Sequence, residues 1–181
     1  MTDLTAAGAG DRAAALEARL NSLSDEAAFD ALQRCCGATA WAQGMLARRP
    51  FTDADQLMQA AEELWAGMTP HDILEAFQHH PRIGDVESLR KKFASTAAWA
   101  SGEQAGVNQA SEAVLQALAE GNRAYEARFG YIFIVCATGK SAAEMLEILQ
   151  SRLPNPPALE LRIAAGEQAK ITRIRLEKLL S

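Results

Sequence analysis

Hydrophobic positions recur at three- and four-residue spacing along most of the chain, a period typical of amphipathic α-helices. Alanine, leucine, glutamate and glutamine dominate these stretches, whereas strand-like alternation is scarce. Capping patterns mark several helix starts, among them TPHD at 69–72, SGEQ at 101–104 and SAAE at 141–144. The pattern predicts an all-α, single-domain multi-helix bundle. The expected helices cover residues 25–36, 38–48, 54–66, 70–80, 86–99, 102–120, 122–129, 141–153 and 157–180.

One short segment departs from the helical period. Residues 131–137 read YIFIVCA, which is apolar, aromatic and β-branched, as in a buried strand. The chain offers this segment no obvious strand partner, so its backbone N–H and C=O groups must find partners elsewhere. Two interpretations stay open: the groups bond to local turns and neighbouring helices, or the amides face a ligand. We therefore expect one extended apolar segment near 131–137 within the helical bundle.

A histidine pair closes the expected helix over 70–80. With Phe77 at the centre of the apolar face, the 100° spacing turns His80 inward and His79 towards the opposite side. Pro81 disfavours helical geometry at the preceding residue, so His80 falls at the helix C-terminus, where the macrodipole favours an imidazolium. His80 suits a group that accepts or holds a proton near neutral pH. A satisfied core histidine is the alternative.

Two further polar residues lean towards apolar faces. Arg175 falls inside the inner stripe of the last helix, whereas Arg162 and Arg173 project elsewhere. The stripe consists of Leu161, Ala164, Ala165, Gln168, Ile171, Leu176 and Leu179. Because a buried guanidinium without a partner is costly, Arg175 should meet an anion, either a protein carboxylate or a ligand. Glu103 lies at the edge of the buried face of the 102–120 helix, although taken alone it is better explained as a surface acid favoured by the helix dipole. Together with His80, these residues favour a small-anion site.

Composition narrows the class of protein. The chain has 181 residues, 49% hydrophobic and 23% charged, which fits one globular domain. The net charge of -5 argues against a nucleic-acid partner, and no apolar run reaches the roughly 18 residues of a membrane span. The three cysteines form no disulfide framework and no C-x-x-C motif, which indicates reduced thiols and a cytoplasmic location. Residues 1–19 lack a signal-peptide pattern and are expected to form a loosely ordered or helical lead-in to a domain over 20–181.

Four motifs in order carry a resemblance to a known family. They are HP within AFQHHPRIGD, EQ-x-G within SGEQAGV, N-x-x-Y-x-x-RFG within NRAYEARFG, and I-x-x-x-R-L within KITRIRLEKLL. In these motifs the chain resembles the 2-oxo-4-hydroxy-4-carboxy-5-ureidoimidazoline (OHCU) decarboxylases, which produce (S)-allantoin in urate degradation. The resemblance covers about residues 20–180. It implies an all-α, cofactor-free homodimer that acts on a small ureidoimidazoline substrate.

The resemblance also implies site residues. The family's catalytic histidine, acid and arginine match His80, Glu103 and Arg175. Positions that contact substrate match Pro81, Gln104, and the backbone of Phe133, Ile134, Val135, Cys136 and Ala137. Where some members carry a substrate-contacting serine, this chain has Ala100 followed by Ser101, so the contact shifts to Ser101 or is lost. Where some members read HPDLAG, this chain reads HPRIGD, so no roles are transferred to Arg82 and Asp85.

Two other functions fit parts of the pattern. A metal-dependent hydrolase would use His79 and His80, but these side chains diverge and His71 lies most of a helix away, so we expect no metal site. A non-enzymatic helical adaptor would explain the helices and the acidic charge. It would not require three inward polar residues, and it should expose a sizeable apolar patch.

Overall fold

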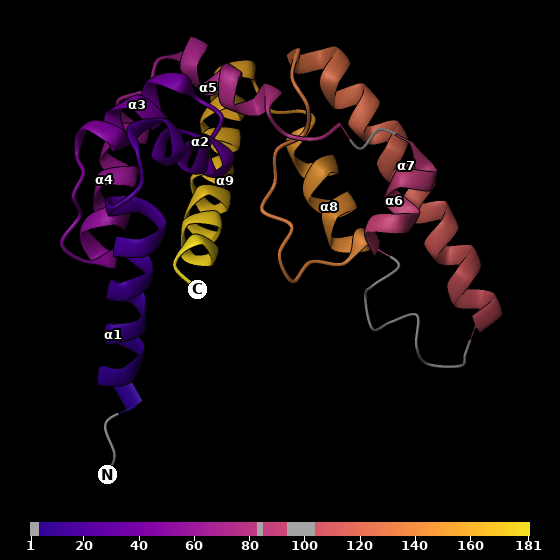
Figure 1. The fold of residues 1–181 in the computed structure, drawn as a ribbon. Coiled ribbons are helices and arrows are strands. Elements are labelled where there is room, and N and C mark those ends of the chain that lie inside the picture. The colour runs from indigo at the N-terminus through magenta and orange to yellow at the C-terminus, as the bar shows by residue number, and fades with distance from the viewer. Residues whose placement is uncertain (1–3, 83–84, 94–103) are drawn as a thin grey trace. The chain divides into compact units, whose positions relative to one another are not determined.

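The computed structural model describes residues 4–82, 85–93 and 104–181 (Figure 1). Within these ranges every regular element is a helix, which confirms the predicted all-α class. The elements are α1 (Leu4–Leu16), the short π-helix η1 (Glu17–Asn21), α2 (Asp25–Cys35), α3 (Thr39–Ala47), α4 (Ala54–Ala66), α5 (Pro70–Gln78), α6 (Val86–Phe93), α7 (Gln104–Phe129), α8 (Ala142–Arg152) and α9 (Pro157–Leu179). None of the described helices combines the length and apolar character needed to cross a membrane.

The expected helices correspond to these elements, with two corrections, one in α7 and one at the end of α5. Separate helices were predicted over 102–120 and 122–129, but α7 runs unbroken through Gly121. A Cβ at Gly121 would lie 2.5 Å from Cδ2 of Leu149 on α8. This glycine therefore permits close packing of two helices and does not end one. The predicted helix over 86–99 is observed as α6, and its residues 94–99 lie outside the described ranges.

The chain divides into two compact units. The first comprises Met1–His79 and Gly166–Ser181, and the second comprises His80–Ala165. Helix α9 contributes residues to both units, since its first turns belong to the second unit and the remainder to the first.

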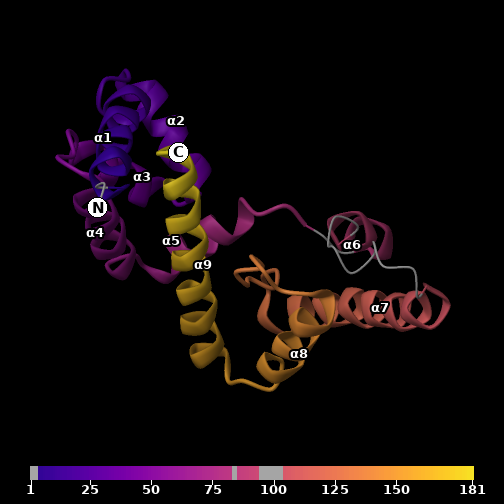
Figure 2. The same cartoon turned by 90° about the horizontal axis from the view of Figure 1, so that it is seen from below.

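The first unit is built around Trp41 of α3. This residue is fully buried, and its indole N–H donates a 3.1 Å hydrogen bond to the carbonyl of Ala61 on α4. Helix α3 packs against α2, α4 and α5, as Figure 2 shows from below. Leu16 and Leu20 of α1 and η1 enter the same core. Part of the expected N-terminal lead-in thus contributes to the hydrophobic interior.

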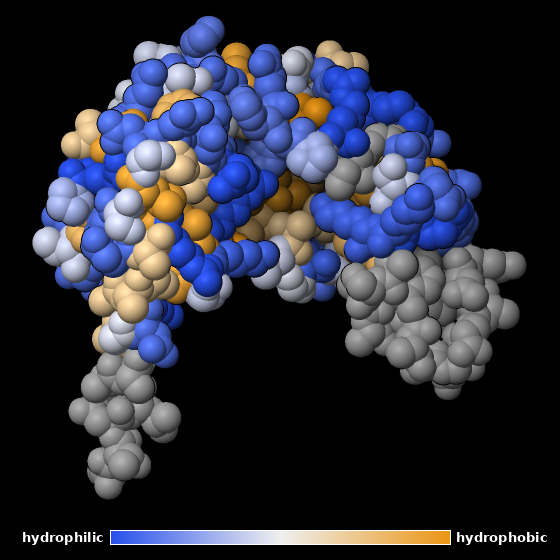
Figure 3. Space-filling view, in the orientation of Figure 1, coloured by the Kyte–Doolittle hydropathy of each residue, from blue (hydrophilic) through white to orange (hydrophobic). Residues whose placement is uncertain are grey.

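The second unit is organised by α7 and α8, which lie side by side (Figures 1 and 2). Its core residues are Leu89, Phe93, Leu115, Leu118, Ala119, Tyr125, Met145 and Leu149. The ring of Tyr125 contacts the rings of Phe129, Tyr131 and Phe133 at centroid distances of 4.6, 5.8 and 5.2 Å. These aromatic contacts attach the apolar segment 131–137 to α7. On the face drawn in Figure 3, hydrophilic side chains cover much of α6 and α7.

Candidate active site

Helix α5 carries the chain towards His80, and its start is fixed by local chemistry. Thr69 accepts a hydrogen bond from the amide of Asp72, and the Asp72 carboxylate accepts bonds from the amide and hydroxyl of Thr69, at 3.2, 3.1 and 2.8 Å. This capping box satisfies amides that would otherwise lack partners. The hydrogen bonds from Thr69 lower the pKa of the Asp72 carboxyl. Pro70 at the first helical position supports the same start.

The end of α5 differs from the expected position. The helix was predicted over 70–80, but it ends at Gln78, with His79 as its C-cap. Pro81 explains the early end, because it disfavours helical geometry at His80. The predicted difference between the two histidines is confirmed: His79 is exposed and His80 is half-buried. His80 follows the cap directly.

Two contacts hold α5 against the start of α3. The carboxylate of Glu75 accepts hydrogen bonds from the amide of Thr39 at 2.6 Å and from its hydroxyl at 3.0 Å. Glu75 thereby caps α3 from another helix, because the N-cap residue Ala38 has no side-chain oxygen. The His79 side chain packs against Gly37, where a Cβ would lie 2.3 Å from its Cγ. The backbone that leads into His80 is therefore fixed from two sides.

The residues after His80 have structural partners. Pro81 is exposed, and the side chain of Arg82 forms an ion pair with Glu126 on α7. Asp85 accepts a 2.6 Å hydrogen bond from the amide of Ser88 and so caps α6. This bond lowers the pKa of the Asp85 carboxyl. Both Arg82 and Asp85 are thus explained by local structure.

Arg175 lies in the middle of α9 and is half-buried, while Arg162 and Arg173 are exposed, as predicted. Its Nη1 donates a 3.4 Å hydrogen bond to the carbonyl of Cys35 at the end of α2. Within the described residues, Arg175 forms no ion pair with a carboxylate. The internal ion pair considered as an alternative is therefore not observed in that part of the chain.

Two buried thiols lie near Arg175. Burial raises the pKa of both Cys35 and Cys36 to about 11, and the positive charge of Arg175 opposes this rise. Cys35, Cys36 and Cys136 are all reduced and buried. The end of α2 therefore offers Arg175 a carbonyl and two neutral thiols, so its positive charge is not neutralised there.

The segment 131–137 is non-helical and carries no strand pairing in the described structure. Three of its carbonyls have partners: those of Ile134 and Cys136 accept from the side chains of Arg152 and Lys140, each at 2.7 Å, and that of Ala137 accepts from the amide of Lys140 at 3.0 Å. Burial alternates along it, because Ile134 and Cys136 are buried and the residues on either side are half-buried. Its amides at 133, 135 and 137 donate no hydrogen bond to the described residues. The bonded carbonyls follow the first interpretation, whereas the contact of the amides with a ligand stays a prediction.

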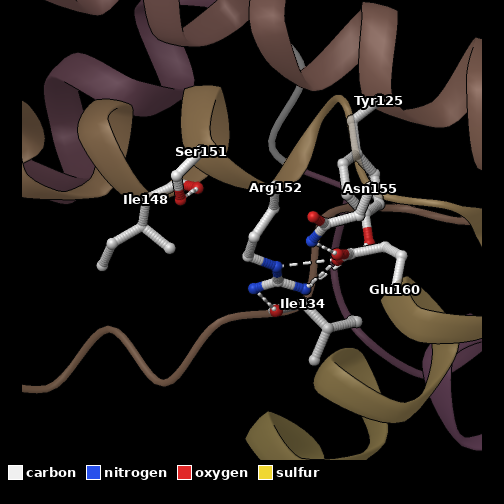
Figure 4. Close-up of polar contacts among 7 residues, drawn as sticks. All are labelled: Tyr125, Ile134, Ile148, Ser151, Arg152, Asn155 and Glu160. Carbon is white, nitrogen blue, oxygen red and sulfur yellow. Dashed lines mark hydrogen bonds and ion pairs between the residues drawn. The ribbon is translucent and has the colours of Figure 1, made fainter.

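A buried polar network lies directly behind this segment (Figure 4). The Glu160 carboxylate accepts from Arg152 Nε at 2.7 Å, from the Tyr125 hydroxyl at 2.6 Å and from the Asn155 side chain at 3.0 Å. Arg152 is 5% exposed and Glu160 is fully buried. Burial and the hydrogen bond to Glu160 raise the pKa of Tyr125. A charged pair removed from water to this extent needs such complete pairing.

Arg152 and Glu160 were not among the predicted site residues. Their signal was present in the helical period, since Arg152 falls on the line of Met145 and Leu149 in α8. Glu160 falls on the buried line of α9, which follows a four-residue spacing through Ala164 and includes Gln168, Thr172 and Leu176. The predicted stripe omitted the polar members Glu160 and Thr172. Searching the helices for charged residues on apolar lines would have found the pair.

Some of the predicted site residues lie outside the described ranges, and the others belong to different units. Glu103, Ala100 and Ser101 lie outside the described ranges, and Gln104 begins α7 with a side chain that is also outside them. His80 belongs to the second unit and Arg175 to the first. Convergence of His80, Glu103 and Arg175 therefore stays a prediction. Among the described residues, no three His, Cys, Asp or Glu side chains are grouped so that they could hold a metal ion.

The chain is similar to known proteins over most of its length. The family described as OHCU decarboxylase matches residues 21–177. The chain is 40% identical over 149 residues to the uric acid degradation bifunctional protein TTL of Arabidopsis thaliana. That match covers 81% of this chain and 45% of the relative, so the chain spans less than half of the plant protein.

Two further comparisons cover nearly the full length of both partners. The 2-oxo-4-hydroxy-4-carboxy-5-ureidoimidazoline decarboxylase of Halalkalicoccus jeotgali is 24% identical, over 88% of this chain and 89% of the relative. A crystal structure of an OHCU decarboxylase in the presence of (S)-allantoin has a TM-score of 0.66 and 37% sequence identity. That likeness covers 87% of this chain and 99% of the solved one.

Proposed function

Because the chain belongs to the OHCU decarboxylase family, we propose that it removes carbon dioxide from 2-oxo-4-hydroxy-4-carboxy-5-ureidoimidazoline and produces (S)-allantoin. The observation that carries this proposal is the family match over residues 21–177. The likeness to an OHCU decarboxylase crystallised in the presence of (S)-allantoin supports the same substrate class. The activity is that of a carboxy-lyase in urate degradation.

The chemistry needs charge stabilisation and one directed proton transfer. One ring carbon of the substrate carries both a carboxylate and a hydroxyl. When the bond to the carboxylate breaks, carbon dioxide leaves and the electron pair stays on the ring carbon, from which it delocalises into the ring. The electron pair forms an enol with the neighbouring ring carbon, which carries the ureido group. A proton then adds to that ureido-bearing carbon from one face, while the hydroxyl loses its proton and becomes the ring carbonyl of (S)-allantoin. Hydrogen-bond donors around the ring oxygens stabilise the charge that develops.

The proposed catalytic residues divide this work. His80 acts as the acid and base towards the substrate hydroxyl or carboxylate, and Glu103 orients the substrate and assists the proton transfer. Arg175 binds the developing negative charge. The half-buried position of His80 at the end of α5 supports its role, as does the absence of a carboxylate partner for Arg175 among the described residues.

The proposed substrate contacts come from two regions. Gln104, Pro81 and Ser101 contact the ring, with Ala100 in the place of the serine found in some relatives. Across residues 133–137, backbone amides donate to the ring oxygens. The amides at 133, 135 and 137, which donate to no described residue, support this part of the proposal.

The proposed enzyme is a cofactor-free, cytoplasmic homodimer. Three reduced cysteines support a cytoplasmic location, because disulfides are rare there. Light scattering coupled to size-exclusion chromatography tests the dimer, and cell fractionation tests the location. A monomer or a secreted protein would contradict these two points and leave the activity unaffected.

The deciding experiment generates the short-lived substrate in situ from urate, adds the purified chain and follows the chirality of allantoin by circular dichroism. We expect (S)-allantoin to accumulate at a rate proportional to the protein concentration and unchanged by EDTA. Racemic allantoin at the rate seen without the protein would overturn the proposal. Activity lost with EDTA and restored by zinc would instead favour a metal-dependent enzyme.

A further inference from the structure

We propose that Arg152 is a positioning residue, which holds segment 133–137 so that its outward amides meet the substrate. The inference rests on the proposed function, because it gives the segment a ligand. Arg152 itself is buried behind the segment, and its partners are all protein groups. Its action on the reaction is therefore indirect.

The two edges of the segment differ in their hydrogen-bond partners. In an extended chain, the N–H and C=O of one residue point to the same edge, and those of the next residue point to the other. The carbonyls of Ile134 and Cys136 accept from the side chains of Arg152 and Lys140, so this edge faces the protein. The carbonyl of Ala137, where the following turn begins, accepts from the amide of Lys140 at 3.0 Å. The amides at 133, 135 and 137 then share the opposite edge. Those three donate to no described residue and are left for a ligand.

Arg152 holds the protein-facing edge of the segment through several directed contacts. Arg152 Nη1 donates to Ile134 at 2.7 Å, while its Nε and Nη2 lie 2.7 and 2.5 Å from one oxygen of Glu160. The guanidinium also lies over the ring of Phe133, 4.7 Å from its centroid. A planar guanidinium fixes the direction of its bonds to Ile134 and Glu160 at once (Figure 4). Arg152 thus holds this stretch of backbone through the carbonyl of Ile134 and through the side chain of Phe133.

The pair formed by Arg152 and Glu160 is both charged and buried. A buried ion pair adds little net stability compared with apolar residues of equal volume, so its retention calls for another use. Glu160 is in turn fixed by Tyr125 and Asn155. The network therefore connects α7, α8 and α9 to one backbone carbonyl. This arrangement suits the orientation of donors towards a reacting group, where small displacements are costly.

Arg152→Lys is the test variant, because lysine keeps the charge beside Glu160 but cannot also reach Ile134 in the same geometry. Arg128→Lys is the matched control: Arg128 is exposed, and its Nη2 donates a 2.9 Å bond to the carbonyl of Asn155. We expect Arg152→Lys to lower kcat/KM for (S)-allantoin formation by roughly 10- to 100-fold. The Arg128→Lys variant should stay within about twofold of the unchanged protein.

A second readout separates positioning from loss of folding. In ¹⁵N NMR spectra, (S)-allantoin should shift the amide signals of Phe133, Val135 and Ala137 in the unchanged protein and not in Arg152→Lys. The helical circular dichroism of both should match. Unaltered kcat/KM and unaltered shifts in Arg152→Lys would overturn the inference, as would an activity loss no larger than its unfolded fraction. If the unchanged protein makes no (S)-allantoin, the proposed function fails. In that case, NMR amide signals of Phe133, Val135 and Ala137 that are equally sharp in the unchanged protein and in Arg152→Lys also overturn the positioning role.

Discussion

Gly37 and His79 are packed so closely that no other residue fits at position 37 without movement. A Cβ on Gly37 would lie 2.3, 2.5 and 2.6 Å from Cγ, Cβ and Cδ2 of His79. Because His79 caps α5 and immediately precedes His80, this contact fixes the backbone that leads into the proposed catalytic histidine. Gly37, in the loop between α2 and α3, therefore affects the proposed catalytic histidine through packing, without contacting the substrate itself.

Gly37→Ala should move the end of α5. We expect a loss of about 1–3 kcal/mol in the free energy of unfolding, since overpacking forces neighbouring atoms to shift. Activity should fall further than the folded fraction does. Denaturant unfolding and the allantoin assay measure the two effects.

The double variant Gly37→Ala/His79→Gly provides the check. It removes all three clashing atoms of His79, so it should recover most of the lost activity and show strong coupling in a double-mutant cycle. Gly166→Ala is a control, because a Cβ there meets nothing within 4 Å. If the double variant behaved as the sum of the two single variants, the contact would not be the cause.

His80→Asn should keep the fold and lose (S)-allantoin formation by roughly 100-fold or more, because asparagine cannot exchange a proton near neutral pH. His71→Asn is the control: the His71 side chain is 91% exposed at the start of α5. The circular dichroism of both variants should match that of the unchanged protein. Near-normal turnover by His80→Asn would remove this residue from the mechanism.

Arg175→Lys should weaken substrate binding and turnover, because lysine lacks the forked donor geometry that suits a carboxylate. We expect roughly a tenfold or larger fall in kcat/KM for (S)-allantoin formation. Arg173→Lys is the matched control. Arg173 lies two positions before Arg175 on α9, and its exposed guanidinium forms ion pairs with Glu62 and Glu177. Equal effects of the two changes would show that Arg175 has no special contact with the substrate.

Stability should fall in alkaline solution. Burial raises the pKa of Cys35 and Cys36 from 9.0 to about 11, so the folded protein keeps protons that the unfolded chain releases. The stabilisation is complete below pH 9 and is lost as the pH rises through 11. Each thiol contributes on the order of 2 kcal/mol.

Denaturant unfolding at pH 8 and at pH 10.5 measures this loss. Cys35→Ala/Cys36→Ala should show a smaller decrease between the two pH values. The raised pKa of Tyr125 acts in the same direction, so some decrease should remain in the variant. An unchanged free energy of unfolding across this range would contradict the assignment.

The helical period predicted most of the fold, because apolar stripes and caps act locally. The predicted bounds of α4 agree with the observed helix, and those of α3 and α8 differ by one residue at each end. The Gly121 error arose because the role of this glycine depends on Leu149, a contact between helices that local propensity does not contain. Two features of the site were also local, namely the different exposure of His79 and His80 and the inward lean of Arg175.

What the sequence did not reveal depends on contacts between distant segments. Glu75 caps α3 from 36 positions away, and Gly37 contacts a histidine on another helix. The Arg152–Glu160 pair was missed because the predicted stripe of α9 began at Leu161, one residue after the buried glutamate. Neighbouring helical residues point about 100° apart, so a stripe assigned one position too late leaves out a buried charged residue.

The polar network around Arg152 also bears on the order in which the protein folds. Its bonds join residues 18 and 35 positions apart, whereas Arg175 meets Cys35 across 140 positions. Short loops close at lower entropic cost, so the region between α7 and the start of α9 can form early. The helices α1 to α5 leave the ribosome first but complete their hydrophobic core only after Leu176 and Leu180 have been synthesised. During translation, this first-made part must therefore wait with an exposed apolar surface, and it is the part for which chaperones would have the greatest use.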